Sequence, residues 1–200
     1  MESGKKEKCA KKIKTIKVGI WGGHGGSAWD DGSYSGIQVI TLKYGRCIDS
    51  IQVQYSDKTG KPVLAHKHGG IGGNHTSQIK LQPDEFLIGI TGHYSPVVHG
   101  GTPVICSLTI KSNRRTFGPF GAEEGTPFTL SMEGGFIVGF YGRGGWYLDA
   151  IGIYLSHTPT STNLYQTVQQ KIQKLGSMAS KQLGYRIPNS ASTDTTARTT

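Results

Sequence analysis

Two short segments combine glycines with one aspartate in a pattern suited to a polyhydroxylated ligand. The pattern Gly-x-x-x-Asp occurs at Gly45–Asp49 and again at Gly145–Asp149, each time leading into an alternating strand. Glycine lets the backbone turn with a positive φ, so that the following amides point outward as donors. The aspartate adds two acceptor oxygens. Vicinal hydroxyl groups, each both donor and acceptor, match this array.

A second kind of glycine-rich segment is also repeated. Trp21-Gly-Gly-His-Gly-Gly26 recurs as His68-Gly-Gly-Ile-Gly-Gly73, with a weaker third copy at Phe117–Gly121. Such a loop has no side chains that would keep a ligand from the main chain. Beside a Gly-x-x-x-Asp loop it would form a shallow cleft with one fixed carboxylate, binding at an affinity on the order of millimolar. The alternative is that both segments are only tight turns.

The elements that would position these loops are β-strands. The chain between residues 18 and 157 contains β-branched and aromatic runs bounded by Gly, Pro, Asp and Asn, and it has no useful helical period. We therefore predict an all-β fold. The predicted strands are Ile37–Leu42, Ile48–Tyr55, Phe86–Ile90, Val104–Ile110, Phe136–Tyr141 and Tyr147–Leu155.

These strands belong to an internal repeat. Phe86–Gly92 resembles Phe136–Gly142, which lies about 50 residues later, and the two Gly-x-x-x-Asp segments lie about 100 residues apart. Three copies of a unit of roughly 45–50 residues imply pseudo-threefold symmetry. The sequence thus predicts three four-stranded sheets that together form a prism.

Charge and composition divide the chain of 200 residues into three parts. The net charge is +9, but residues 18–157 carry ten basic and ten acidic side chains and hold most of the 30 glycines. We predict a basic, flexible N-terminal extension over 1–13, one domain over 14–157, and a Ser/Thr-rich basic tail over 158–200. Within the tail, apolar residues at helical spacing predict a short amphipathic helix over 164–175.

Signatures of catalysis are missing from the sequence. It contains no G-x-S-x-G elbow, no G-x-G-x-x-G segment and no P-loop. The carboxylate pairs Asp30-Asp31 and Glu123-Glu124 are adjacent, so we expect them to be solvated in loops rather than to face each other. The sequence therefore argues against an enzyme.

A metal site is also not expected. His66 and His68 would share a face of a strand and could bind a metal together with His24 or His75. No carboxylate or thiolate lies at a supporting spacing, so we interpret these side chains as surface or loop histidines.

The compartment and the remaining partner classes follow from the rest of the chain. No apolar run is long enough to span a membrane, and no signal peptide is visible. The three cysteines, Cys9, Cys47 and Cys106, form neither a disulfide framework nor a CxxC motif, which suits a cytoplasmic or nucleocytoplasmic protein.

Aromatic residues do not alternate with the N-terminal lysines, which argues against nucleic acid as a partner. A nucleic-acid or anionic-surface binder acting through the basic ends remains an alternative.

Several motifs together resemble the jacalin-related lectins, over about residues 14–156. The matching segments are Trp21–Asp30, Gly118–Gly121, Gly125–Phe128 and Gly142–Tyr154. The resemblance implies a β-prism I fold of three four-stranded Greek-key sheets. It also implies a homo-oligomer that binds carbohydrate without a metal, a cofactor or catalysis.

The resemblance also implies two binding sites. Carried over residue by residue, the first would comprise Gly26, Trp146, Tyr147 and Asp149. The second, implied by the similarity to banana-type members, would comprise Gly73, Arg46, Cys47 and Asp49. The third repeat has Ile105–Cys106 in place of the aspartate, so we expect it to be inactive.

The resemblance favours mannose- or glucose-containing glycans and glycoproteins as partners. Galactose-binding members are cleaved to free a glycine α-amino group, whereas here Lys17–Trp21 is uninterrupted. A protein-interaction module with vestigial sugar sites is the remaining alternative.

Overall fold

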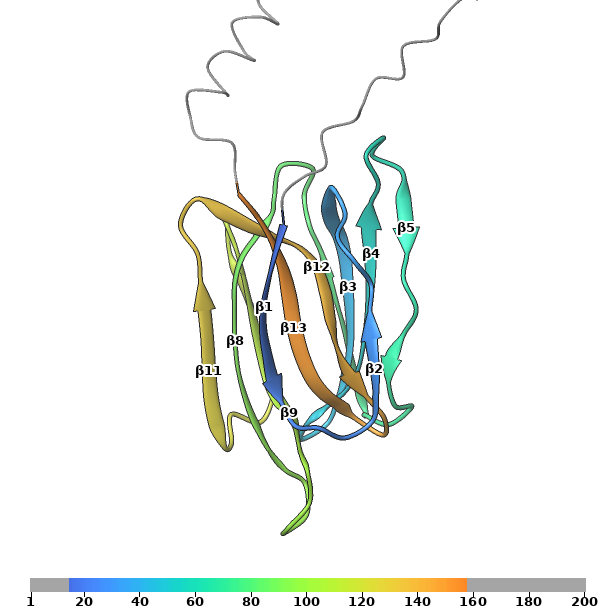
Figure 1. The fold of residues 1–200 in the computed structure, drawn as a ribbon, viewed down its shortest axis with the longest axis vertical. Helices are drawn as coiled ribbons and strands as arrows, with labels where there is room; N and C mark the ends of the chain where they lie inside the picture. Colours follow the sequence, from blue (N-terminus) through green and yellow to red (C-terminus); the bar gives the residue numbers. More distant parts are fainter. Residues whose placement is uncertain (1–14, 158–200) are drawn as a thin grey trace, which may run out of the picture. The chain divides into compact units, whose positions relative to one another are not determined.

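The computed structural model describes residues 15–157, which form thirteen β-strands in three antiparallel sheets (Figure 1). This confirms the all-β fold predicted from the alternating runs. Within this range no helix could span a membrane. The predicted extension over 1–13, the tail over 158–200 and the helix over 164–175 lie outside the described residues and stay predictions.

The first sheet joins the beginning and the end of the domain. It comprises β1 (Thr15–Gly22), β2 (Ser27–Asp30), β12 (Gly135–Gly144) and β13 (Leu148–His157) in the order β1-β13-β12-β2. The hairpin of β12 and β13 forms its centre, and the glycine-rich connection from β1 to β2 crosses the end of that hairpin. The two predicted loop types of this sheet are therefore brought to one place.

The second sheet follows the same plan with one difference. It comprises β3 (Gly36–Tyr44), β4 (Ile48–Ser56), β5 (Pro62–Leu64), β6 (His68–Gly69) and β7 (His75–Lys80). The order is β5-β4-β3-β7, and β6 also pairs with β4. Because β5 and β6 pair with different parts of β4, they together occupy the place of the predicted fourth strand.

The third sheet has four strands around the hairpin of β8 (Leu87–Pro96) and β9 (Pro103–Ser112). The edge strands are β10 (Thr116–Gly121) and β11 (Thr126–Ser131), and the order is β10-β9-β8-β11. The β8–β9 hairpin projects beyond the other loops at the lower end of Figure 1. All three sheets thus consist of a central hairpin with edge strands on both sides.

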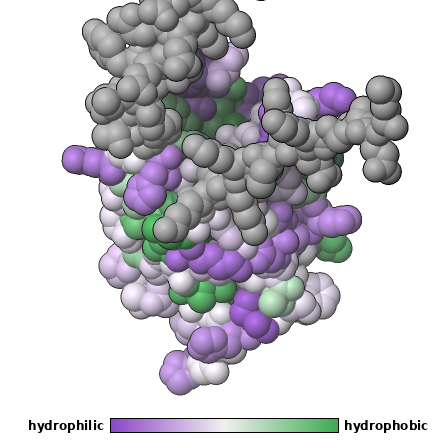
Figure 2. All heavy atoms as spheres, turned by 45° about the horizontal axis from the view of Figure 1, so that its top comes forward, coloured by the Kyte–Doolittle hydropathy of each residue, from purple (hydrophilic) through white to green (hydrophobic). Residues whose placement is uncertain are grey.

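The core lies between the three sheets and draws on each central hairpin. Alternation along the strands sends one set of apolar side chains inward, and removing each from water stabilises the fold by about 1.5–3 kcal/mol. In Figure 2 the visible surface is mostly hydrophilic or neutral, with only small hydrophobic areas. The fully buried side chains include Ile40, Ile51, Leu108, Ile110, Phe140 and Ile153.

A polar network joins the first two sheets and corrects two expectations. Asp30 and Asp31 are not simply solvated. Asp30 accepts a hydrogen bond of 2.7 Å from the Tyr154 hydroxyl, and Asp31, whose side chain is only 5% exposed, lies 2.7 Å from His68 Nε2. The Tyr55 hydroxyl donates to the second oxygen of Asp31 at 2.8 Å. His68 is therefore a largely buried structural histidine rather than a surface one.

Glu85 ties the connection between β7 and β8 to the β9–β10 hairpin. Its buried carboxylate accepts hydrogen bonds from Arg115 Nε at 2.9 Å, Arg115 Nη2 at 3.0 Å and Ser112 Oγ at 2.7 Å. The hydrogen bonds from Arg115 are the main reason that the pKa of Glu85 falls from 4.5 to about 2. Since the folded-state pKa is depressed, this interaction stabilises the protein fully above pH 4.5, and the stabilisation is lost as the pH falls through about 2.

We predict that Glu85→Gln destabilises the protein in a pH-dependent way. At pH 7 the variant should unfold at a lower urea concentration than the wild type, and the difference should shrink as the pH falls from 4.5 towards 2. Glu133→Gln, at an exposed position, is the matched control and should match the wild type at every pH. A Glu85→Gln effect that stays constant across this pH range would contradict the account.

Candidate functional site

Four connections gather in pairs at the end of the prism that lies opposite Thr15 and His157 (Figure 1). In the first sheet, the β1–β2 loop meets the β12–β13 loop. In the second sheet, the β6–β7 loop meets the β3–β4 loop. Each pair combines one double-glycine segment with one Gly-x-x-x-Asp segment, as the cleft hypothesis requires. We call the two places site 1 (Gly25, Gly26 and Gly145–Asp149) and site 2 (Gly72, Gly73 and Gly45–Asp49).

In site 1 the glycine loop lies directly against the aspartate. A Cβ atom on Gly26 would lie 2.6 Å from Asp149 Oδ2, and one on Gly25 would lie 2.3 Å from Asp149 Oδ1. Gly26 also has a φ of +57°, which side-chain-bearing residues rarely adopt. Only glycine therefore lets the main chain approach the carboxylate this closely.

The Asp149 carboxylate is buried and incompletely paired. The residue is 6% exposed, and Oδ2 has no hydrogen-bond partner among the described residues. Burial raises the pKa of Asp149, while the nearby Arg143 guanidinium and the Gly145 amide lower it and offset this only in part. A buried acceptor without a donor costs folding free energy, so this oxygen is suited to accept a hydroxyl proton from a ligand.

Arg143 holds the glycine loop in place. Its Nε donates to the Gly25 carbonyl at 2.8 Å, and its Nη2 donates to the Gly26 carbonyl at 2.7 Å. These charge-assisted bonds from β12 orient the loop so that its carbonyl groups face Arg143. The loop geometry thus depends on a side chain outside the predicted site.

The tip of the β12–β13 loop presents its main chain and one aromatic side chain. The Gly145 amide donates to the Tyr147 carbonyl at 2.9 Å and closes a tight turn. Trp146 is 83% exposed, so its indole is available to cover a ligand face. Tyr147 is half-buried and lines the cavity at site 2, although its backbone belongs to the loop of site 1.

Site 2 repeats this arrangement in the second sheet. A Cβ atom on Gly73 would lie 2.7 Å from Asp49 Oδ2, and one on Gly72 would lie 2.3 Å from Asp49 Oδ1. Lys43 Nζ donates to the Ile71 carbonyl at 3.0 Å, so Lys43 braces this loop from β3 as Arg143 braces the first. The site opens into a cavity of about 280 Å³ lined by Gly45, Arg46, Cys47, Asp49, Gly73, Asn74, Val97 and Tyr147.

The electrostatics of site 2 are similar, but two of its predicted residues have other partners. Asp49 is 6% exposed, and burial raises its pKa against the opposing effects of the Gly45 amide and of Lys43. The exposed Arg46 side chain forms a salt bridge with Glu124 of the third repeat. Cys47 is largely buried but lines the cavity, and its sulfur atom lies 2.8 Å from that of Cys106.

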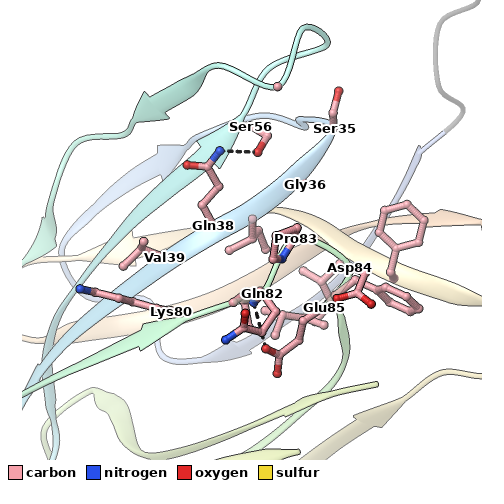
Figure 3. A pocket seen from close by; sticks show the side chains of 17 residues that line it. Ser35, Gly36, Gln38, Val39, Ser56, Lys80, Gln82, Pro83, Asp84 and Glu85 are labelled. Atoms are coloured by element: carbon pink, nitrogen blue, oxygen red, sulfur yellow. Dashed lines mark hydrogen bonds between the residues drawn. The ribbon is translucent and has the colours of Figure 1, made fainter. Parts of the chain in front are cut away.

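A second, larger cavity of about 760 Å³ lies at the opposite ends of the strands (Figure 3). Its polar groups pair with one another. Gln38 Nε2 donates to Ser56 Oγ at 2.8 Å, and the main-chain N–H of Gln82 donates to Glu85 Oε2 at 3.1 Å. Glu85 is further satisfied by Arg115. No carboxylate lining this cavity is both buried and unpaired among the described residues, in contrast to site 1.

Comparison with known proteins places this geometry in a family. The model of the jacalin-like lectin domain matches residues 18–154. The chain belongs to the jacalin-like lectin family. "Jacalin-related lectin 19" of Arabidopsis thaliana is 57% identical over 162 residues, which covers 80% of this chain and 91% of that protein. The agglutinin of Castanea crenata is 44% identical and covers 74% of this chain, which in turn spans 51% of that protein.

Solved structures of jacalin-like lectins share the fold. Artocarpin in complex with mannotriose is 49% identical, with a TM-score of 0.68 over 72% of this chain and 99% of artocarpin. The mannose-specific jacalin-related lectin from Morus nigra, in complex with mannose, is 46% identical, with a TM-score of 0.68 over 75% of this chain and 99% of that one. These similarities confirm the β-prism fold.

The third repeat keeps the backbone arrangement of the other two repeats but lacks their aspartate. Gly23, Gly70 and Ala122 donate equivalent main-chain hydrogen bonds to the carbonyl groups of Asp149, Asp49 and Cys106. Cys106 therefore occupies the position of the aspartates. Glu123 and Glu124 stand where the other two loops have His24-Gly25 and Ile71-Gly72.

The jacalin-like loops include residues that the sequence reasoning missed. Arg143 and Lys43 brace the glycine loops, and Gly25 and Gly72 approach the aspartates as closely as the predicted Gly26 and Gly73 do. The sequence does contain a pattern that identifies Arg143 and Lys43. A basic side chain precedes the Gly-x-x-x-Asp segment by two positions in both repeats.

We predict that Gly26→Ala is much more damaging than Gly32→Ala. Gly32 has a φ of +79° but open space where a Cβ would lie, so its substitution should cost only about 1 kcal/mol of unfolding free energy. At Gly26 the Cβ would also lie 2.4 Å from the Gly144 carbonyl group, which should bring the total to about 3 kcal/mol or more. Urea unfolding of both variants tests this, and equal losses would contradict the close contact.

We further predict that Asp149→Asn is at least as stable as the wild type. The folded-state pKa of Asp149 lies above its ordinary value, so the ionised carboxylate destabilises the fold at neutral pH, and this penalty is relieved as the pH falls through the raised pKa. The amide removes the charge at similar volume. Thermal unfolding at pH 7 should give an equal or higher Tm, and a clear drop would show that the carboxylate is paired in the folded protein.

Proposed function

We propose that this lectin binds mannose- or glucose-type glycans at site 1 and site 2. The observation that carries the proposal is the buried, glycine-lined carboxylate at each site, to which no side chain within residues 15–157 donates a hydrogen bond. Two neighbouring sugar hydroxyls would donate to this carboxylate, and outward-facing amides of the Gly-x-x-x-Asp loop would donate to sugar oxygens.

The preference for mannose or glucose rests on two further points. The artocarpin structures contain mannotriose and mannopentose, and the Morus nigra structure contains mannose. Galactose-binding members of the family are cleaved to free a glycine α-amino group, whereas in this chain Lys17–Trp21 is a continuous part of β1. A galactose-specific lectin of Morus indica is also 42% identical, so galactose is the proper competing ligand in any test.

We propose that binding needs neither a metal nor catalysis. At both sites the polar groups offered are one carboxylate and main-chain amides, which suffice to pair with hydroxyl groups without a bridging cation. Each hydrogen bond to the carboxylate contributes about 1.5–3 kcal/mol before desolvation, so a shallow site of this kind binds a monosaccharide with a Kd on the order of millimolar. Homo-oligomerisation, which we propose from the family resemblance, would raise the avidity. A cytoplasmic or nucleocytoplasmic location stays a prediction.

We predict that Asp149→Asn and Asp49→Asn each remove one binding site. Calorimetric titration of the full chain with methyl α-mannopyranoside should give two sites for the wild type, one for each single variant and none for the double variant. The reason is that the side-chain NH2 group of Asn is a donor. It cannot accept the hydrogen bond that a sugar hydroxyl donates to the carboxylate. Addition of EDTA should leave all titrations unchanged.

Asp84→Asn is the matched control. Asp84 is an exposed aspartate whose salt bridge with Arg114 lies away from both sites, so this variant should keep two binding sites. If the double variant still binds methyl α-mannopyranoside as the wild type does, sugar is not bound at the aspartates. If methyl α-galactopyranoside binds more tightly than the mannoside, the proposed preference is wrong.

A further inference from the structure

Two cysteines from different repeats meet beside site 2. Cys47 lies in the β3–β4 loop of site 2, and Cys106 lies in β9 at the position that carries an aspartate in the other repeats. Their sulfur atoms are 2.8 Å apart, and both residues are free thiols that are only 3% exposed. Val97, Val104 and Tyr147 pack around them. The pair therefore forms a small enclosed cluster between the second and third repeats.

The spacing of the two sulfur atoms suits a bond between them better than a shared metal ion. Two thiolates bound to one zinc ion lie about 2.3 Å from the metal, which places them well over 3 Å from each other. A disulfide requires a separation of about 2.05 Å, less than 1 Å from the observed distance. Residues 15–157 also contain no group of three His, Cys, Asp or Glu side chains that could hold a metal.

The surroundings favour a thiolate on one member of the pair. The hydrogen bond from the Cys47 thiol is the main cause that lowers the pKa of Cys106, and the Arg46 guanidinium lowers it further. The same contact raises the pKa of Cys47, which keeps its proton. When such a thiolate is oxidised to a sulfenic acid, a neighbouring thiol can react with it at once to form a disulfide.

Small oxidants have a route to Cys47 and, through it, to the neighbouring Cys106. Cys47 lines the cavity of about 280 Å³ at site 2, together with Arg46 and Asp49. A hydroperoxide is small enough to enter this cavity. Cys47 thus lies at the wall of an open site, and the Cys106 sulfur is 2.8 Å from the Cys47 sulfur.

We propose that Cys47 and Cys106 form a redox-active dithiol that a hydroperoxide closes to a disulfide. The Cys106 thiolate attacks one oxygen of hydrogen peroxide, the O–O bond breaks, and Cys106 becomes a sulfenic acid while hydroxide leaves. Hydroxide takes the proton of Cys47 and becomes water. The Cys47 thiolate then attacks the Cys106 sulfur, the S–S bond forms, and a second hydroxide leaves and is protonated by solvent. In total, two thiols are oxidised, and one peroxide is reduced to two waters.

The disulfide would link the loop of site 2 to the third repeat. Cys47 is one of the residues whose main chain we assign to sugar binding, so this consequence rests on the proposed function. A covalent link holds the Arg46 and Cys47 amides in one arrangement, and less conformational freedom is then lost when a sugar binds. We expect site 2 to bind sugar several-fold more tightly in the oxidised protein.

The first test detects the bond itself in the full chain carrying Cys9→Ser, which leaves only these two thiols. After treatment with hydrogen peroxide, the intact mass should fall by about 2 Da, and alkylation under denaturing conditions should find no free thiol. Trypsin should release residues 47–58 joined to residues 81–111, and dithiothreitol should separate them. Two alkylated thiols after oxidation, or oxygen added to one cysteine without a cross-link, would overturn the proposal.

Matched controls replace one thiol at a time. Cys47→Ser and Cys106→Ser, each with Cys9→Ser, should show no loss of about 2 Da and should instead gain oxygen on the remaining sulfur. If either variant fails to fold, oxidation of the parent chain still decides the question, because the cross-linked peptides are identified directly.

The second test separates this proposal from the proposed function. In the chain carrying Cys9→Ser and Asp149→Asn, only site 2 is expected to bind methyl α-mannopyranoside. Calorimetry should give a Kd at least about threefold lower after oxidation than after reduction. Equal affinities would overturn the coupling to site 2. If neither form binds the sugar while the cross-linked peptides are present, the sugar site is wrong and the dithiol stands.

Discussion

The contact between a glycine main chain and a buried aspartate is the constraint on which both candidate sites depend. At Gly26 and Gly73 a single added carbon would lie within 2.7 Å of a carboxylate oxygen. The fold thereby keeps each carboxylate away from water and surrounds it with backbone rather than with side-chain donors. Two consequences of that arrangement are the raised pKa of Asp149 and an Asp149 oxygen, Oδ2, that has no hydrogen-bond partner in the described part of the chain. In the function that we propose, a ligand with two adjacent hydroxyl groups would supply the hydrogen-bond donors that each carboxylate lacks.

The threefold repeat explains how one chain builds this contact more than once. Each double-glycine segment also lies against the next repeat, since a Cβ atom on Gly23 would meet the Pro103 carbonyl and one on Gly70 the Trp146 carbonyl. Ala122 completes the cycle with a hydrogen bond of 2.8 Å to the Arg46 carbonyl. These contacts require small residues and a fixed backbone, but they do not require an aspartate. The third repeat can therefore keep the scaffold and carry Cys106 instead.

Strands can be predicted from the sequence where burial controls residue type. The six predicted strands are the central hairpins of the three sheets, because strands that are buried on one face carry alternating β-branched and aromatic residues. The edge strands were missed, since segments such as β10, with two glycines and a proline in six residues, resemble turns locally and are extended only by pairing with a neighbour. At the sites, repetition revealed the glycines and aspartates. It could not reveal that Tyr147 reaches across to site 2, or that Cys47 meets Cys106, because both depend on contacts between repeats.

The most direct test of the central claim is a crystal structure of the full chain with methyl α-mannopyranoside. We expect one sugar at site 1 with two adjacent hydroxyl groups within hydrogen-bond distance of the Asp149 carboxylate, a second sugar at Asp49, and none at Cys106. A sugar bound away from both aspartates, or a sugar at site 1 whose hydroxyl groups do not contact the Asp149 carboxylate, would contradict it.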